Sequence, residues 1–151
     1  MTETMRFRSL SRGQRRKLEK DAAELAEELA AEQYGVIHRS DREEWYDAVD
    51  TDTGAKYEVK SATREIGDEY PARGRFRVRR DQTRSLLSSD ARGTAWYVFV
   101  LIDDPEGVIR FRRMRPSTVS SIVRERGGWN QAGHEEFEEQ MKLPISAVIY
   151  R

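Results

Sequence analysis

Hydrophobic residues recur at helical spacing near the start of the chain. Leu18, Ala22, Leu25 and Leu29 stand at i, i+4, i+7 and i+11, which predicts one amphipathic helix from Ser11 to Gln33. Gly35 is a natural stop for this helix, and Val36-Ile37 is expected to form a short strand after it. The residues before the helix, 1–11, are polar and basic without periodicity, which predicts a flexible basic arm.

The stretch from Trp45 to Ala62, WYDAVDTDTGAKYEVKSA, alternates apolar and polar residues on both sides of Asp52-Thr53-Gly54. This pattern predicts a β-hairpin, because strand side chains point to opposite faces with period two. If the turn holds an even number of residues, Asp47 lies on the same face as Glu58 and Lys60.

The rest of the chain predicts further strands and helices around a core. Thr63–Gly74 is expected to be a loop beside the hairpin, and the segment around residues 134–145 has too little periodicity for an assignment. The remaining elements are a strand at Arg75–Arg79, a helix at Asp81–Ser88, a doubly buried strand at Trp96–Ile102, its partner at Val108–Phe111, and a helix from Pro116 to the Gly127–Asn130 segment. We find no repeat or linker, so residues 12–151 are expected to form a single domain.

The charges are balanced in total but separated along the chain. Among 151 residues, 27 are Lys or Arg and 27 are Asp or Glu. The basic segments are Arg6–Lys20, Arg73–Arg84 and Arg110–Arg115, and Asp21–Asp50 is acidic. Folding can therefore produce strongly polarised surfaces on a neutral protein.

Two classes of protein are excluded by composition. The chain has no cysteine, so disulfides, thiolate zinc sites and cysteine nucleophiles are impossible. No apolar run approaches the roughly 18–20 residues of a membrane span, and the expected location is cytoplasmic.

The hairpin carries the strongest chemical signal. Asp47, Glu58 and Lys60 are expected to converge as two carboxylates and one ammonium, an arrangement that holds a divalent cation beside an activated water. The alternative is a cross-strand salt bridge on a solvated sheet face, because surface pairs of this kind are common.

The pattern of Asp47 followed by Glu58-Val59-Lys60 at the end of an apolar strand resembles the PD-(D/E)xK phosphodiesterase superfamily. The resemblance implies an α/β fold of restriction-endonuclease-like type, with a mixed central sheet flanked by helices. It also implies that Asp47, Glu58 and the backbone carbonyl of Val59 bind Mg²⁺, with Mn²⁺ as a substitute. Lys60 would then be the catalytic lysine that assists the attacking water.

The spacing around the first helix is similar to that of archaeal Holliday-junction resolvases, a branch of the same superfamily. Glu24 stands eleven residues before Gly35, and Asp47 stands twelve residues after it. The resemblance implies that Glu24 is a helix-borne catalytic acid, with Glu28 as a substitute. It further implies a homodimer that pairs two sites to cut two strands, and the apolar residues of the tail are compatible with such an interface.

Arg75, Arg77 and Arg79 alternate with Phe76 and Val78, so the arginines are expected to form a basic row on one face of a strand. Such a row suits phosphates, although an ordinary half-exposed strand explains it too. Gln82 resembles superfamily residues that contact the site. The expected nucleic-acid-binding residues are Arg73, Arg75, Arg77, Arg79, Arg80, Gln82 and Arg84.

The sequence thus predicts a metal-dependent DNA endonuclease that hydrolyses phosphodiester bonds, with branched or structured DNA as a candidate substrate. Two alternatives stay open: a non-catalytic nucleic-acid-binding protein that keeps the nuclease fold, and a small protein-interaction domain.

Overall fold

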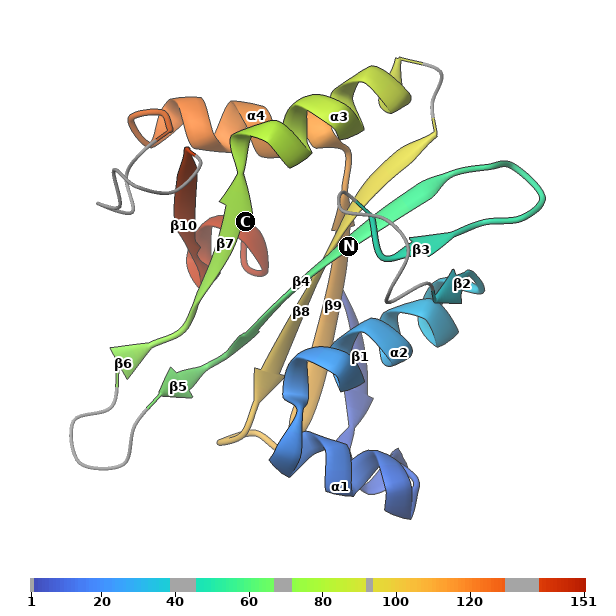
Figure 1. Ribbon diagram of the computed structural model, residues 1–151. Helices are drawn as coiled ribbons and strands as arrows, with labels where there is room; N and C mark the ends of the chain where they lie inside the picture. The colour runs from blue at the N-terminus through green and yellow to red at the C-terminus, as the bar shows by residue number, and fades with distance from the viewer. Residues whose placement is uncertain (1, 39–45, 67–71, 92–93, 130–138) are drawn as a thin grey trace.

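A six-stranded mixed sheet forms the centre of the protein in a computed structural model that describes residues 2–38, 46–66, 72–91, 94–129 and 139–151 (Figure 1). The strand order is β1-β9-β8-β4-β3-β2, and β4 pairs with β8 in parallel while the other neighbours are antiparallel. The elements are β1 (Glu3–Arg6), the 3-10 helix η1 (Phe7–Ser9), α1 (Arg12–Lys20), α2 (Ala22–Tyr34), β2 (Ile37–His38), β3 (Ala48–Val49), β4 (Lys56–Thr63), β5 (Glu65–Ile66), β6 (Ala72–Arg73), β7 (Arg75–Arg79), α3 (Arg80–Asp90), β8 (Ala95–Asp103), β9 (Val108–Met114), α4 (Pro116–Glu125), β10 (Gln140–Pro144) and α5 (Ile145–Val148). The predicted α/β fold with a mixed central sheet flanked by helices is confirmed.

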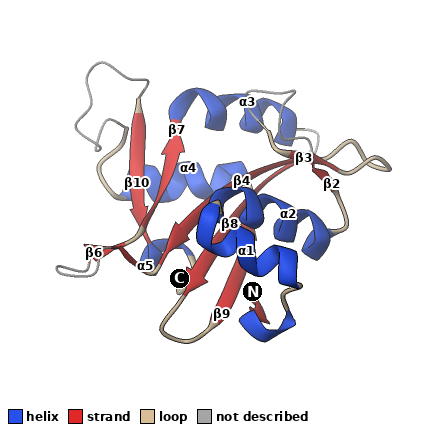
Figure 2. Ribbon diagram, turned by 60° about the horizontal axis from the view of Figure 1, so that its bottom comes forward, coloured by secondary structure: helices blue, strands red, loops and turns tan. Residues whose placement is uncertain are grey.

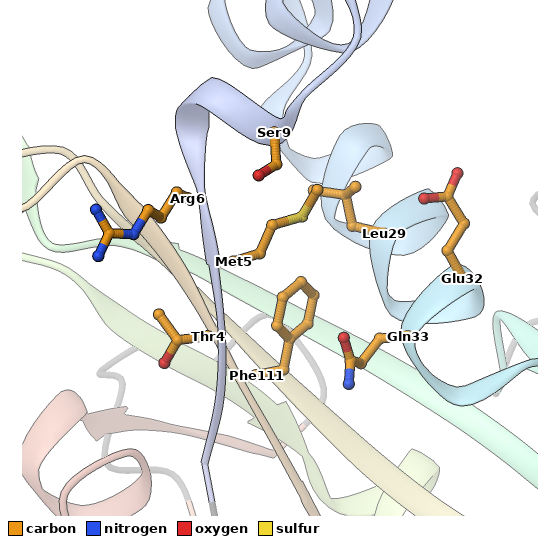
Figure 3. Close-up of a pocket in the computed structure, with 8 residues that line it drawn as sticks. All are labelled: Thr4, Met5, Arg6, Ser9, Leu29, Glu32, Gln33 and Phe111. Carbon is orange, nitrogen blue, oxygen red and sulfur yellow. The ribbon is translucent and has the colours of Figure 1, made fainter.

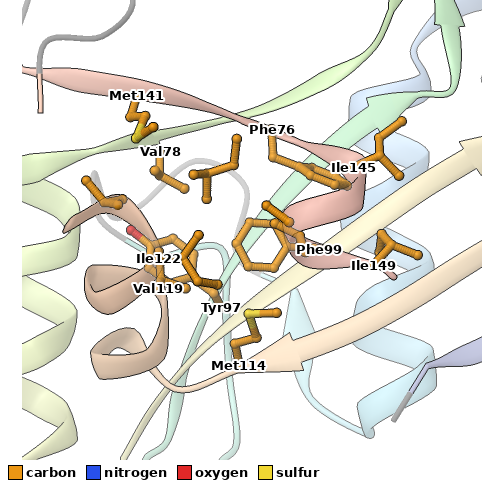
Figure 4. Packing of buried hydrophobic residues seen from close by; sticks show 14 of the residues in the cluster. Phe76, Val78, Tyr97, Phe99, Met114, Val119, Ile122, Met141, Ile145 and Ile149 are labelled. Carbon is orange, nitrogen blue, oxygen red and sulfur yellow. The ribbon is translucent and has the colours of Figure 1, made fainter. Parts of the chain in front are cut away.

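Strand β8 divides the interior into two hydrophobic cores. Its side chains alternate, so Tyr97 and Phe99 enter one core while Val98 and Val100 enter the other. The first core packs against α3, α4 and the β7–β10 pair, and contains Phe76, an edge-to-face neighbour of Phe99 (Figure 4). The second core packs against α2 on the other face of the sheet (Figure 2). Burial on both faces explains why β8 reads as a continuous apolar run.

The helix expected from Ser11 to Gln33 is in fact two helices that meet at Asp21. The Asp21 amide donates to the Lys17 carbonyl at 2.7 Å, which closes α1. The Asp21 carboxylate accepts from the Glu24 amide at 3.1 Å, which caps the start of α2. Gly35 ends α2 with a φ of 66°, as predicted from the sequence.

The N-terminal residues are part of the sheet rather than a flexible arm. Strand β1 pairs with β9, and the Phe7 amide then donates to the Gly107 carbonyl at 2.9 Å. Leu10 is buried, and Met5 and Phe7 pack on the second core. These apolar side chains supply the burial that ties the segment down.

Other boundaries differ from the expectation. Helix α3 begins at Arg80, so Asp81 lies in its first turn rather than at the cap, and α3 continues to Asp90. The expected loop Thr63–Gly74 contains the antiparallel strands β5 and β6, with residues 67–71 outside the described part of the chain. The segment without periodicity supplies β10, which pairs with β7. Among the described residues, none of the helices is long and apolar enough to cross a membrane.

Gly74 permits a close approach between the end of β4 and the start of β7. A Cβ at this position would lie 1.8 Å from the Thr63 carbonyl oxygen, and the Gly74 amide donates to the Arg64 carbonyl at 3.1 Å. We expect Gly74→Ala to lower the free energy of unfolding by roughly 1–3 kcal/mol, because backbone must move to relieve the clash. Urea unfolding measures the change.

Gly13→Ala is the control for this substitution. Gly13 lies within α1 with nothing inside 4 Å of a built Cβ, so alanine should stabilise the protein by about 0.5–1 kcal/mol through helix propensity. Equal effects of the two substitutions would contradict the close approach.

Candidate active site

The hairpin of β3 and β4 places the motif acids directly across from each other. Ala48 pairs with Tyr57 and Val49 with Lys56, so Asp47 is the residue opposite Glu58. The Asp47 amide donates to the Tyr57 carbonyl at 2.8 Å, so Asp47 is held against the same residue of β4 that pairs with Ala48. The expected parity is confirmed. Trp45, assigned to the same strand from the sequence, lies outside the described residues.

The Asp47 side chain binds the edge of β4 immediately beyond this register. Its Oδ2 accepts from the Val59 amide at 2.8 Å. In a strand, residues two apart direct their amides and carbonyls to the same edge. The Val59 carbonyl therefore points toward the edge where Tyr57 meets Asp47, which leaves a carbonyl oxygen and two carboxylates in one region.

Glu58 is buried although it carries a carboxylate. It is 4% exposed, and burial raises its pKa to about 9. The Lys60 ammonium opposes this rise in the pKa, whereas the nearby carboxyls of Asp47 and Glu27 add to it. A buried acid beside two other acids favours its neutral form unless a cation is close.

The third acid, Glu27, comes from α2. The pKa of Glu27 is raised to about 8, chiefly by burial and next by its interaction with the Asp47 carboxyl. His38 Nε2 on β2 lies 3.2 Å from Glu27 Oε2. One helix and three strands thus bring side chains to a single edge of the sheet, as the neighbouring positions of α2, β2, β3 and β4 show in Figure 1.

Lys60 is held from two sides. Its Nζ lies 3.6 Å from Glu58 Oε1 and donates to Gln82 Oε1 at 2.7 Å. Gln82 is itself buried in the first turn of α3. The next residue, Thr83, fixes that turn because its hydroxyl bonds to the Arg79 carbonyl and to the Tyr97 hydroxyl at 2.7 and 2.6 Å. The position of the ammonium group is therefore fixed by one side chain from the sheet and one from α3.

Two acids and a lysine thus lie close together at this site, and the comparison with known protein families bears on them. The chain matches the PD-(D/E)XK nuclease superfamily domain over residues 13–150. It belongs to this superfamily. No curated protein matches the chain.

PD-(D/E)XK nucleases generally use divalent metals, and the donor set here can be tested against that requirement. The described residues contain no ready-made cluster of three or more His, Cys, Asp or Glu in metal-holding geometry. Asp47 and Glu58 are nevertheless brought together by the β3–β4 register, and the Asp47 carboxyl contributes to the raised pKa of Glu58. Two carboxylates and a carbonyl suit a hard cation that keeps several of its own waters. The residues therefore fit such a cation without a full protein cage.

The resemblance in spacing to archaeal Holliday-junction resolvases implied Glu24 as the helix-borne acid, whereas the structure brings Glu27 close to Asp47 and Glu58. Glu24 Oε1 lies 3.9 Å from Lys17 Nζ, and Glu28, the substitute, also pairs with Lys17. Both acids thus face α1. The sequence held one signal for Glu27: Tyr34 follows it by seven residues, so the two share one side of α2. In the structure Tyr34 stacks on Tyr57 of β4 with ring centroids 6.1 Å apart, so this side of α2 faces the hairpin.

The arginine row predicted on β7 is present. Arg75, Arg77 and Arg79 are exposed and alternate with buried Phe76 and Val78. Strand β10 adds Lys142 directly opposite Arg77, so two like charges meet across the pair. Arg84 is exposed on α3, and Arg80 pairs with Glu139. Arg73 lies in β6, and its side chain is outside the described part of the structure.

The segment Arg110–Arg115 is one of the basic segments of the sequence, but its arginines have partners within the fold. Arg110 pairs with the fully buried Asp103 at 3.1 Å, and Arg112 donates to the Val148 carbonyl at 2.7 Å. Arg113 donates to the Tyr57 hydroxyl at 3.1 Å and covers the Trp96 ring. Arg115 covers the same ring and pairs with Asp90. These contacts hold the sheet to its flanking layers.

A surface pocket of about 460 Å³ lies apart from this site, between α2 and the β1–β9 pair (Figure 3). Met5, Leu29 and Phe111 form its apolar part, and Arg6 and Glu32 are among its polar lining residues. None of the residues of the acidic cluster lines it. A nuclease acts on a polymer bound at its surface, so we place the candidate active site at Asp47, Glu58 and Lys60 rather than at this pocket.

The raised pKa of Glu58 predicts a pH dependence of stability. In the unfolded chain the Glu58 pKa is near 4.5, so between about pH 4.5 and 9 the folded state keeps a proton that the unfolded state loses. Stability of the metal-free protein should therefore fall as pH rises through this window. Glu58→Gln removes the titration, so in EDTA its melting temperature should rise relative to wild type from pH 5 to pH 9.

Parallel melting temperatures of the two proteins across this window would contradict the buried, acid-surrounded position of Glu58. Glu125→Gln is the matched control, because Glu125 is exposed on α4, where it pairs with Arg151.

Proposed function

We propose that this chain is a Mg²⁺-dependent DNA endonuclease that hydrolyses phosphodiester bonds. The observation that carries the proposal is the buried Glu58, set between Asp47 and Lys60 on the open edge of β4. A protein that used these charges only as a surface salt bridge would leave them solvated. Burial of like-charged acids beside a lysine is typical of sites that bind a cation and activate water.

The cation would be held by Asp47, Glu58 and the Val59 carbonyl. Mg²⁺ is commonly bound by one or two carboxylates and several waters, and Mn²⁺ accepts similar ligands, so we expect it to substitute. When bound, such a cation polarises the scissile phosphate and lowers the pKa of a coordinated water. Ionised Asp47 and Glu58 supply the negative charge that retains it.

Lys60 carries the next part of the chemistry. The Gln82 carbonyl oxygen and Glu58 hold its ammonium at the edge of the acidic cluster, where it orients the attacking water and attracts the phosphate. Gln82, which the sequence assigned to nucleic-acid binding, is better supported as the residue that positions Lys60. Glu27, rather than Glu24, is supported as the helix-borne acid by its hydrogen bond with Asp47.

DNA would bind through its backbone. Arg75, Arg77 and Arg79 repeat roughly every 6–7 Å along β7, and Lys142 broadens the row. Arg84 extends the positive charge onto α3, and Arg73 and Arg80 belong to the same basic region of the sequence. A polyanion relieves the repulsion between Arg77 and Lys142 and gives salt-dependent affinity. We further propose branched DNA as a substrate and a homodimer that pairs two sites, on the resemblance to resolvases.

Cleavage of a panel of branched and linear DNAs tests the activity directly. Wild type should cut in Mg²⁺ or Mn²⁺ and not in EDTA. Asp47→Ala and Lys60→Ala should each reduce the single-turnover rate by at least about 100-fold, because each removes charge stabilisation from the reaction. Their DNA affinity should remain, since the arginines supply it.

Asp52→Ala is a matched control on the exposed turn of the same hairpin. Undiminished cleavage by the Asp47 or Lys60 variant would remove that residue from the mechanism. DNA binding by wild type without cleavage of any substrate would favour a non-catalytic binding protein that keeps the fold.

Glu27→Gln and Glu24→Gln decide which helix acid takes part. Both substitutions remove one charge from the same helix, but only Glu27 bonds to Asp47. We expect Glu27→Gln to reduce the cleavage rate by about tenfold or more and Glu24→Gln to change it by less than about twofold. The opposite ranking would return the helix-borne role to Glu24.

A further inference from the structure

His38 is the polar neighbour of the acidic cluster to which neither the motif nor the superfamily match assigns a role. Its Nε2 lies 3.2 Å from Glu27 Oε2, and its side chain is only 20% exposed. Strand β2 pairs His38 with Ala48, the residue that follows Asp47. The imidazole therefore lies at the junction where α2 approaches the start of β3.

Glu27 needs such a partner to stay in the cluster. Its carboxyl lies among Asp47, Glu58 and other acids, and each repels it when ionised. With 24% of its side chain exposed, Glu27 has a route to solvent by rotation of its side chain. A ring nitrogen fixed on β2 opposes that rotation, because its hydrogen bond holds one carboxyl oxygen of Glu27 and leaves the other for Asp47.

We propose that His38 is a positioning residue for the active site, which holds Glu27 against Asp47 so that the acids present a preformed face to the cation. This inference rests on the proposed metal-dependent nuclease function. His38 does not touch the phosphate or the water in this arrangement. Its contribution is to the geometry of Glu27 and, through Glu27, of Asp47, in the way that outer hydrogen bonds orient metal-binding carboxylates.

Substituting His38 with glutamine or with asparagine distinguishes a hydrogen-bonding role of His38 from a packing role. Glutamine places its NH₂ group near the position of histidine Nε2, whereas asparagine places it near Nδ1, about one bond short of Glu27. Mg²⁺ titrations of wild type, His38→Gln, His38→Asn and His38→Ala should be followed by melting temperature and by single-turnover cleavage. Circular dichroism first verifies that each variant is folded.

We expect His38→Asn and His38→Ala to raise the Mg²⁺ concentration for half-maximal effect roughly 10–100-fold in both assays. His38→Gln should stay within about threefold of wild type. The KM for DNA should be unchanged in all variants, because the basic row on β7 is intact. If His38 only stabilised the fold, the substitutions would lower the melting temperature in EDTA, but the Mg²⁺ requirement would not rank His38→Asn and His38→Ala above His38→Gln.

Two results would overturn the inference. The first is Mg²⁺ dependence equal to wild type in all three variants, which would leave the nuclease function standing. The second is a loss in His38→Gln as large as in His38→Ala, which would mean that the hydrogen bond is not what matters. If wild type itself shows no Mg²⁺ response in either assay, the proposed function fails and the inference fails with it.

A spectroscopic measurement reads the contact without activity. The sequence has two histidines, His38 and His134, so His38→Gln assigns the imidazole ¹⁵N resonances. Glu27→Ala should shift the His38 resonances in EDTA. Resonances that stay in place would contradict the contact itself, whatever the enzyme does.

Discussion

The hydrogen bond from the Val59 amide to Asp47 Oδ2 stands where a backbone bond between β3 and β4 would otherwise form. In the register of this pair, the backbone of Tyr46 would accept from Val59 if β3 extended by two more residues. A side chain takes that position instead, so the strand edge is satisfied while a carboxylate is fixed at it. Because β3 begins only at Ala48, its ladder with β4 stops at Tyr57, and the Val59 backbone lies beyond it.

The same arrangement has an energetic cost that the surrounding layers offset. Three acids in one place favour protonation or separation, as the raised pKa values of Glu27 and Glu58 indicate. The cluster persists because its members are attached to well-packed elements. Tyr57 and Val59 on the same strand are buried in the second core, and α2 contributes Leu25 and Leu29 to that core. Strained or repulsive groups supported by a rigid scaffold are characteristic of functional sites.

The sequence predicted the parts of the site that depend on local alternation. Asp47 and Glu58 were predicted to be neighbours from strand parity, because a turn with an even number of residues places them on the same face. Glu27 could not be chosen in this way, because Glu24, Glu27 and Glu28 all lie on the polar surface of one helix. Their roles were decided by the break at Asp21, which turns α1 back so that Lys17 meets Glu24 and Glu28. Arg112 and Arg113 show the same limit: their partners Val148 and Tyr57 are distant in sequence.

The parallel pairing of β4 with β8 has a consequence for the order of folding. The β3–β4 hairpin is local and can form early, whereas the pairing of β4 with β8 is a long-range contact, because β5, β6, β7 and α3 lie between the two strands in the sequence. In an isolated hairpin Glu58 would remain hydrated and ionise near the pKa of a free side chain. Glu58 becomes desolvated once β8 pairs with β4 and Tyr97 lies beside it. The unfavourable burial of the Glu58 carboxylate therefore accompanies the slow, long-range step of folding and does not oppose formation of the local hairpin.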